Sequence, residues 1–248
     1  MAGAKRGYKE IVDELRARIE QGVYPVGAKI PSESEVMKEF GAGRETVTKA
    51  LRELKHFGLT TVSQGAAAKV RGFNPIRRNA VERLSRATWG AGVSMWSVDV
   101  RDEKPKVAGL QVQRLEAAPR IAEALGLERG ASVVLRRRHY VLSGKPVLMA
   151  DSFIPADLAE GTPIADEDTG PGGIYARLED IGHGPVRFKE EVVARMPRRA
   201  EESLLRLEAG TPVLGVVRTA FDAQGRAVEV NDMVLDAGNY VLDYVTEA

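Results

Sequence analysis

Residues 31–54 read PSESEVMKEFGAGRETVTKALREL, and this stretch decides the fold of the N-terminal part of the chain. Ser32 is a good helix N-cap, and Glu35 three positions later completes a capping box, so a short helix is predicted to begin there. Gly41-Ala42-Gly43 interrupts the helical pattern, and a second helix is predicted over about 44–56. Two short amphipathic helices joined by a glycine turn form a helix-turn-helix, whose second helix typically enters the major groove of DNA.

The flanking sequence predicts a winged form of this motif. Apolar residues at helical spacing predict a first helix over about 8–21, which Gly22 ends. Gly58 is suited to the left-handed position after the second helix of the motif. The segments 59–63 and 67–71 read as two short strands around Gln64-Gly65, which would form a small wing.

The free face of this motif carries side chains that suit DNA. Arg44 stands at the front of the reading helix, where bidentate contact with guanine is possible. Thr46 and Thr48 could touch thymine methyls or donate hydrogen bonds to phosphate, and lysines suit phosphate alone. The alternative is that Arg44 and Lys49 are solvated helix residues paired with Glu45 and Glu53. The full set expected at DNA is Lys29, Ser32, Ser34, Arg44, Glu45, Thr46, Thr48, Lys49, Gln64, Gly65 and Lys69.

The distribution of charge agrees with a DNA-binding head. The whole chain of 248 residues has a formal net charge of only +1, but residues 1–72 hold 13 Lys and Arg against 9 Asp and Glu. A mildly basic head on a mildly acidic body fits one domain that meets phosphates and another that does not.

The amino-acid composition argues against disulfide bonds, metal sites and membrane-spanning segments. The chain has no cysteine, which excludes disulfides and thiolate metal sites, and its three histidines have no ligand spacing. We therefore expect no metal and no cofactor. No apolar run is long enough to span a membrane, and no apolar signal segment follows the N-terminus, so we expect a cytoplasmic protein without a membrane partner.

The rest of the chain predicts an α+β domain rich in antiparallel strands. Segments 132–142 and 146–154 flank Ser143-Gly144-Lys145, and 211–221 and 227–235 flank a second turn at 222–225, so both pairs read as hairpins. Further strands are expected at 107–115, 186–194 and 240–244, and helices at 119–125, 173–181 and 198–207. The predicted organisation is a head at 1–72, a linker at 73–85 and a second domain at 86–248.

The head resembles that of the GntR family of bacterial transcription factors. The resemblance rests on Pro31-Ser32-Glu33, on the segment 44–51 with its Arg-x-Thr-Val-x-x-Ala-Leu pattern, on Gly58-Leu59 and on Gly65. The body is similar to the UTRA effector domain of the HutC branch, at 136–140, 144–147, 152–155, 172–178 and 228–231. The resemblance implies a regulator, usually a repressor, with a chorismate-lyase-like UTRA fold, a ligand pocket and a homodimer.

The head departs from the pattern of its relatives at three places. Ser34 and Thr48 stand where many relatives have arginine, and the wing lacks the Arg-Gly pair often found near its tip. Fewer guanidinium contacts are therefore available, and the operator is expected to differ from the common one of the family.

The effector site is expected on the first hairpin. Arg136 and Arg138 are two apart on a predicted strand, so both point to one face and could clamp a phosphate, sulfate or carboxylate. Ser152 on the partner strand could add a donor, Glu229 an acceptor and Tyr240 an aromatic wall. In the resembling family these positions or near neighbours line the effector site. The alternative is a solvated arginine face paired with acidic neighbours. Trp89 and Trp96 are expected to pack in a core or interface.

These observations predict a ligand-controlled dimeric repressor. Two heads would read a palindromic double-stranded operator, and the ligand would change the geometry of the linker and release the DNA. Two alternatives stay open: an enzyme of lyase type that uses the C-terminal domain, and a DNA-binding protein without a small-molecule effector.

Overall fold

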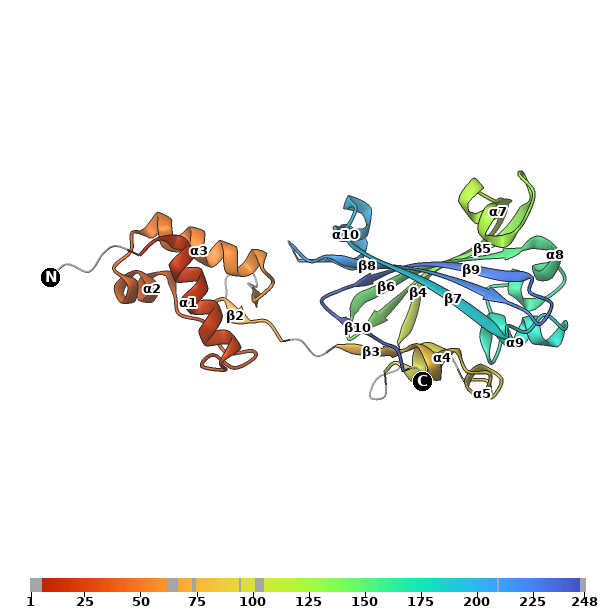
Figure 1. The fold of residues 1–248 in the computed structure, drawn as a ribbon, viewed down its shortest axis with the longest axis horizontal. Coiled ribbons are helices and arrows are strands. Elements are labelled where there is room, and N and C mark those ends of the chain that lie inside the picture. Colours follow the sequence, from red (N-terminus) through yellow and green to blue (C-terminus); the bar gives the residue numbers. More distant parts are fainter. Residues whose placement is uncertain are drawn as a thin grey trace. The chain divides into compact units, whose positions relative to one another are not determined.

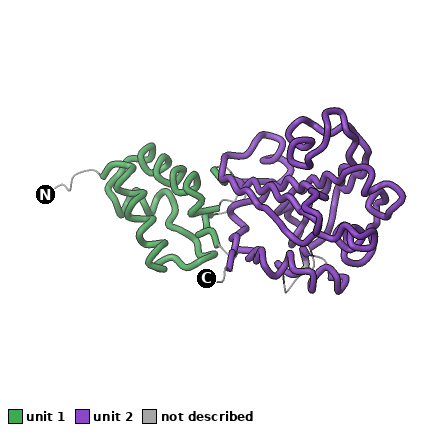
Figure 2. Tube along the Cα trace, turned by 45° about the vertical axis from the view of Figure 1, so that its right-hand side comes forward, with its two compact units in different colours: residues 1–74, 208–211 green, residues 75–207, 212–248 purple. Residues whose placement is uncertain are grey.

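The computed structural model describes residues 6–61, 67–72, 75–93, 95–100, 105–208 and 210–245. The chain forms two compact units (Figure 2). Unit 1 comprises residues 1–74 together with 208–211, and unit 2 comprises residues 75–207 and 212–248. Each unit has its own buried apolar core and is described by itself. No helix in the described part of the chain is long and apolar enough to cross a membrane.

Unit 1 is three helices and a small antiparallel pair of strands (Figure 1). Its elements are α1 (Tyr8–Glu20), α2 (Glu33–Phe40), α3 (Arg44–His56), β1 (Thr60–Thr61) and β2 (Lys69–Val70). Ser32 caps α2 and forms the expected capping box with Glu35, and Gly41 ends α2 in the left-handed conformation. Ile11 and Leu15 of α1 pack with Val47 and Leu54 of α3 in one core. Residues 62–66, which include the expected wing tip Gln64 and Gly65 and the end of the first predicted strand, lie outside the described residues.

Unit 2 is built on a six-stranded antiparallel sheet with the strand order β4-β5-β6-β9-β8-β7. The strands are β4 (Lys106–Glu116), β5 (Ser132–Leu142), β6 (Lys145–Pro155), β7 (Arg187–Arg195), β8 (Val213–Phe221) and β9 (Ala227–Asp236). Both predicted hairpins, β5–β6 and β8–β9, are present with their turns. The expected α+β class is confirmed.

Helices lie on both faces of this sheet. On one face, α7 (Pro119–Leu125) and α10 (Arg199–Leu205) pack at its two ends (Figure 1). The other face, called the inner face below, carries Arg136, Ser152, Asn231 and Arg218 in register. It is covered by a layer made of α4 (Ala80–Leu84), α5 (Arg86–Trp89), α6 (Met95–Val98), α8 (Ala156–Ala159), the 3-10 turn η1 (Pro163–Ala165) and α9 (Gly173–Asp180).

The segment expected as a linker is largely regular structure. β3 (Ile76–Asn79) pairs in parallel with β10 (Tyr240–Asp243), and Asn79 then caps α4 through hydrogen bonds from the amides of Val81 and Glu82. Residues 75–85 therefore belong to unit 2, and the prediction of a linker over 73–85 is wrong for this part. The strand forms because its backbone groups find partners on β10, far away in sequence.

Candidate DNA-binding surface and effector pocket

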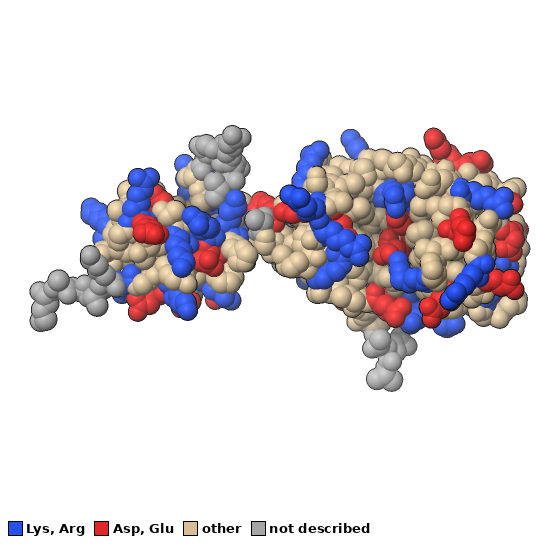
Figure 3. All heavy atoms as spheres, turned by 90° about the horizontal axis from the view of Figure 1, so that it is seen from above, with Lys and Arg blue, Asp and Glu red and all other residues tan. Residues whose placement is uncertain are grey.

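The solvent face of α3 is the surface on which the DNA hypothesis depends. Arg44, Glu45 and Lys49 are exposed on it, and Thr46 is half-buried. A shallow hollow on this face is lined by Arg44, Glu45, Thr48, Lys49, Arg52 and Glu53. Basic and acidic side chains are interspersed over unit 1 in Figure 3, so the contact with phosphates would depend on individual cations.

Glu33, which the sequence analysis did not single out, organises this face. Its carboxylate accepts a hydrogen bond from the hydroxyl of Thr48 and lies 3.4 Å from Nε of Arg44. Thr48 is half-buried and links α3 to α2, so its hydroxyl is not free to donate to a phosphate, contrary to our expectation. The Arg44 side chain keeps 80% of its surface exposed and can leave Glu33 for a ligand.

The other expected DNA residues divide into free and engaged groups. The hydroxyl and the backbone amide of Ser32 both donate to the Glu35 carboxylate and lower its pKa, and the same hydroxyl lies 3.1 Å from that of Ser34. The ammonium of Lys49 lies 3.9 Å from the centre of the Tyr8 ring, a cation–π contact. Exposed Lys29 and Lys69 are bridge partners, which brings two cations together at the base of the wing.

A pocket opens on the inner face of unit 2, where the effector site was expected. Arg136, Arg138 and Glu229 line it, as predicted. Trp96, Tyr140 and Tyr175 supply aromatic walls, and the loop 167–173 forms its rim. Gly172 of this loop has φ +79°, and a Cβ there would come within 2.5 Å of the Trp89 carbonyl, so glycine is required. Trp96 was expected to pack in a core or interface, and its side chain also lines the pocket.

Arg136 holds the rim of this pocket. Its guanidinium donates to the backbone carbonyls of Ile164 and Glu167 at 2.8 Å, and to that of Asp166. The expectation that Arg136 clamps a ligand together with Arg138 is therefore corrected in part. Three of its five N–H groups already fix the loop from η1 to residue 167.

Arg138 is oriented by its neighbours toward the pocket. Its Nη1 donates to Ser152 Oγ at 3.0 Å and its Nε to the Tyr140 hydroxyl at 3.1 Å. Ser152 is fully buried and does not line the pocket, so it supports Arg138 rather than facing a ligand. Tyr240 also does not line the pocket, because it is buried with Trp96 and Tyr140 in an adjoining apolar cluster.

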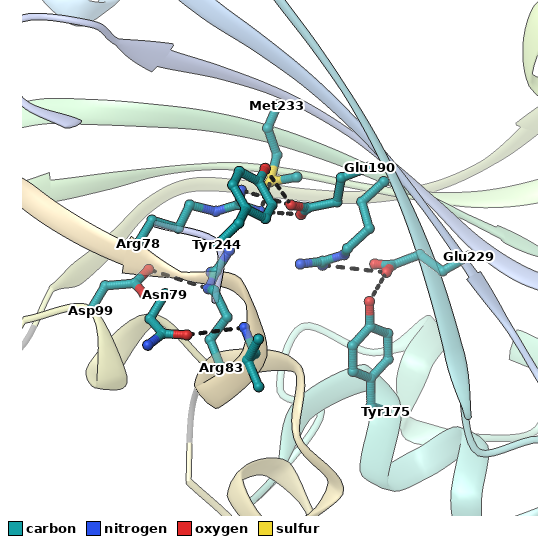
Figure 4. Close-up of polar contacts among 11 residues, drawn as sticks. Arg78, Asn79, Arg83, Asp99, Tyr175, Glu190, Glu229, Met233 and Tyr244 are labelled. Atoms are coloured by element: carbon teal, nitrogen blue, oxygen red, sulfur yellow. Dashed lines mark hydrogen bonds and ion pairs between the residues drawn. The ribbon is translucent and has the colours of Figure 1, made fainter. Parts of the chain in front are cut away.

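Behind the pocket lies a buried network of charges that the sequence analysis missed (Figure 4). Arg78 of β3 makes a bidentate pair with Glu190 of β7, which also accepts from Tyr244 at 3.1 Å. Arg83 of α4 pairs with Asp99 at 3.3 Å. We find no signal for this network in the sequence, because arginine is ordinarily a surface residue.

The same network reaches the pocket through Glu229. The hydroxyl of Tyr175 donates to its Oε2 at 2.6 Å, and Nη2 of Arg218 lies 3.6 Å from the same atom. Burial raises the pKa of Tyr175 well above its usual range, so the phenol stays protonated and remains a donor. Glu229 thus faces both the pocket and the buried arginines.

Buried Asp99 predicts that the stability of unit 2 depends on pH. Burial raises the pKa of Asp99 to about 6, against the charges of Arg83, Arg78 and Arg218. The unfolded chain has an ordinary aspartate pKa of about 3.9, so the folded form binds the proton more tightly. Protonation therefore adds stability as pH falls, and this contribution should grow by about 1 kcal/mol from pH 7 to pH 5.

Urea unfolding followed by tryptophan fluorescence measures this effect. Both tryptophans of the chain, Trp89 and Trp96, belong to unit 2, so the signal reports that unit. Asp99→Asn removes the titrating group and should abolish this part of the pH dependence. Parallel curves for the two proteins between pH 5 and 7 would contradict the assignment.

Each of the two units matches the model of a known protein family. Residues 7–70 match the bacterial regulatory proteins of the gntR family, and residues 101–240 match the UTRA domain. An uncharacterized HTH-type transcriptional regulator of Streptomyces coelicolor is 30% identical over 237 residues, covering 92% of this chain and 88% of that protein. The HTH-type transcriptional repressor NagR of Bacillus subtilis is 26% identical over 223 residues, covering 90% and 87%.

Solved structures agree with this assignment. The crystal structure of a GntR-family transcriptional regulator matches with a TM-score of 0.69 and 25% identity, and the match covers 98% of both chains. The expected winged helix-turn-helix and UTRA domain are thereby confirmed. No cluster of three or more metal-ligating side chains was found among the residues described by the structure.

Proposed function

This chain belongs to the GntR family of bacterial regulatory proteins and carries a UTRA domain, and from that premise we propose that it is a dimeric repressor released from a palindromic operator by a small anionic effector. Its place in the family makes it a DNA-binding transcriptional regulator rather than an enzyme. The single observation that carries the proposal is the α3 face, where exposed Arg44 and Lys49 stand on a helix whose opposite side is buried.

The DNA contacts follow from the chemistry of that face. Arg44 has the reach and the fork geometry for a guanine in the major groove. Lys49, with Lys29 and Lys69 near the wing, supplies compact cations for phosphates. The helix α2 begins at a well-formed cap, so its N-terminal amides can also approach a phosphate.

Dimerisation is proposed because one head has too few contacts for a selective site. A two-fold dimer would present two α3 helices to half-sites about one helical turn apart, roughly 34 Å, or a near multiple of that distance. Footprinting on DNA around its own gene should show a symmetric protected region. A single asymmetric site protected by a monomer would overturn this part of the proposal.

An anionic effector is favoured by the balance of buried charges on and against the inner face, while the exposed acidic residues Glu167 and Asp168 line the rim of the pocket. Five arginines and three carboxylates have buried side chains on or against the inner face. The arginines are Arg78, Arg83, Arg136, Arg138 and Arg218, and the carboxylates are Asp99, Glu190 and Glu229. A negatively charged ligand would offset this excess of positive charge. Arg138 lines the pocket and is the arginine proposed to donate hydrogen bonds to such a ligand.

Thermal shift against phosphorylated sugars, amino-acid derivatives and acyl metabolites tests the effector. A ligand present at 100 times its Kd adds about 2.7 kcal/mol of stability, which such a scan detects. The ligand found should then lower operator affinity by about 5- to 150-fold, the range expected for a coupling of 1–3 kcal/mol. Tighter operator binding would reverse the proposed sign, and no stabilisation by any compound would favour a regulator without an effector.

Lys49→Ala should weaken binding to every duplex by a similar factor. A phosphate contact carries no base information, so the ratio of operator to random DNA affinity should stay unchanged. The slope of log K against log salt should fall by about 1 for each protomer, as measured by fluorescence anisotropy at several salt concentrations. A changed base preference at an unchanged slope would assign Lys49 to a base instead.

A further inference from the structure

One row of polar side chains crosses the inner face of the sheet. Strand register places Glu190 beside Arg218, Arg218 beside Asn231, and Asn231 beside Ser152, which pairs with Arg136. Residues paired across antiparallel strands point to the same side, so the row is continuous. Its Arg136 end lines the pocket, while its Glu190 end is covered by β3, whose Arg78 reaches that carboxylate.

The covered end of this row has buried polar groups without hydrogen bonds. All three guanidinium nitrogens of Arg218 and of Arg83, and both amide atoms of Asn231, have no hydrogen-bond partner in the described part of the chain. All three residues are 0% exposed. Each such orphaned group costs about 1–3 kcal/mol, and charged groups cost more, so their donors call for a partner.

The neighbouring carboxylates leave these donors free. Asp99 lies 3.3 Å from Nε of Arg83 and Glu229 lies 3.6 Å from Nη2 of Arg218, but neither pair forms a hydrogen bond. Glu229 already accepts from Tyr175, which limits what it can offer to Arg218. Arg78 differs, because Glu190 satisfies its two terminal nitrogens.

Arg83 and Arg218 approach this region from opposite layers of unit 2. Arg83 comes from α4 and stacks against Trp96, 4.5 Å from its ring, while Arg218 comes from β8. In Figure 4, Arg78 of β3 and Arg83 of α4 lie opposite Glu190 and Glu229 of the sheet, and Tyr175 reaches Glu229 from α9. Burial, Arg78 and, to a smaller extent, Arg218 lower the pKa of Arg83 to about 10, against the charge of Asp99. A negative charge between these arginines would relieve their repulsion.

We propose that Arg83, Arg218 and Asn231 form a second, interior anion-binding site that accepts one oxyanion of the phosphate, sulfate or carboxylate class. Guanidinium forks and an amide N–H suit the oxygens of such a group. Arg83 stacks on Trp96 and Arg218 pairs with Glu229, and both partners line the effector pocket, so the proposed site adjoins that pocket.

The anion has two possible sources with the same chemistry. It is either a free inorganic ion or the acidic group of a larger molecule that enters through the pocket. This proposal rests on the effector site proposed above only if the anion is the acidic group of a larger molecule that enters through the pocket. DNA binding plays no part in the test, so failure here is distinguishable from failure of the proposed regulator function.

The test is calorimetric titration of the full chain, dialysed free of phosphate and sulfate, with inorganic phosphate, with sulfate and with glycerol 3-phosphate. We expect saturable binding that Arg83→Met and Arg218→Met each weaken at least tenfold. Arg137→Met is the matched control, because Arg137 is exposed on the opposite face and pairs with Asp151; it should change the Kd less than twofold. Binding of the inorganic ions indicates a free anion, whereas binding of glycerol 3-phosphate alone indicates a carried group.

Two outcomes overturn the site. One is the absence of saturable binding by all three probes, which leaves internal water as the partner of these groups. The other is binding that Arg138→Met abolishes while Arg83→Met and Arg218→Met leave it intact, which assigns the anion to the pocket. If the buried variants fail to fold, the site is tested by anomalous diffraction from crystals of the unaltered protein soaked in selenate. An anomalous peak within hydrogen-bond distance of Arg83 and Arg218 is expected, and a peak only at Arg138, or none, refutes the proposal.

Discussion

Arg44→Ala should lower operator affinity by roughly 30-fold to 10⁴-fold. A bidentate contact with guanine contributes about 1–3 kcal/mol, and a dimer would lose two of them, or about 2–6 kcal/mol. The side chain is free to make this contact, because 80% of its surface is exposed and its ion pair with Glu33 is long at 3.4 Å. Fluorescence anisotropy at one fixed salt concentration measures the loss.

Two controls distinguish a guanine contact from a phosphate contact: binding to random duplex DNA, and the same substitution at a second exposed arginine. Binding to random duplex should fall much less than binding to the operator, because the guanine contact is specific. Arg16→Ala is the control, since Arg16 is exposed on α1 and pairs with Glu20 in the adjacent turn. Equal losses on operator and random DNA would make Arg44 a phosphate contact instead.

Glu229→Gln should destabilise unit 2 by about 3–5 kcal/mol, as expected when one partner of a buried ion pair is removed. The carboxylate is 1% exposed, accepts from Tyr175 and is the ion-pair partner of Arg218. The amide removes the ion-pair partner of the buried Arg218 guanidinium. Urea unfolding followed by tryptophan fluorescence reports the change in unit 2.

Glu191→Gln is the matched control for this prediction. Glu191 is exposed on β7 and pairs with Lys189 at the surface, where an ion pair contributes little. Its free energy of unfolding should change by less than about 0.5 kcal/mol. A loss below about 1 kcal/mol in Glu229→Gln would mean that Arg218 does not depend on Glu229 for its charge balance.

Local signals in the sequence were enough to predict many elements of the fold. Ser32 and Glu35 marked the start of α2 because the capping box joins residues only three apart. Gly58 adopts a φ of +69° after α3, as expected for a left-handed stop. The hairpin turns at 143–144 and 222–225 also depend on adjacent residues, and both lie where the sequence predicted them.

Features that depend on distant residues could not be predicted in the same way. Ile76–Asn79 has no alternating pattern and becomes a strand only because β10 pairs with it. Arg136 and Arg138 share a face, as their spacing required, but carbonyls near η1 occupy Arg136. Arg78 is buried against Glu190, 112 residues away, and Arg83 against Trp96 and Asp99 of other short elements, so neither contact follows from adjacent residues.

The parallel pairing of β3 with β10 also bears on the spacing of operator half-sites. The chain leaves unit 1 and enters unit 2 directly through β3, whose four residues are held in register by the last strand. If that register were released, four extended residues would lengthen the tether of each head by about 13 Å. Such slack is a sizeable fraction of the roughly 34 Å between successive major grooves, so heads on loosened tethers would tolerate half-site spacings that fixed ones reject.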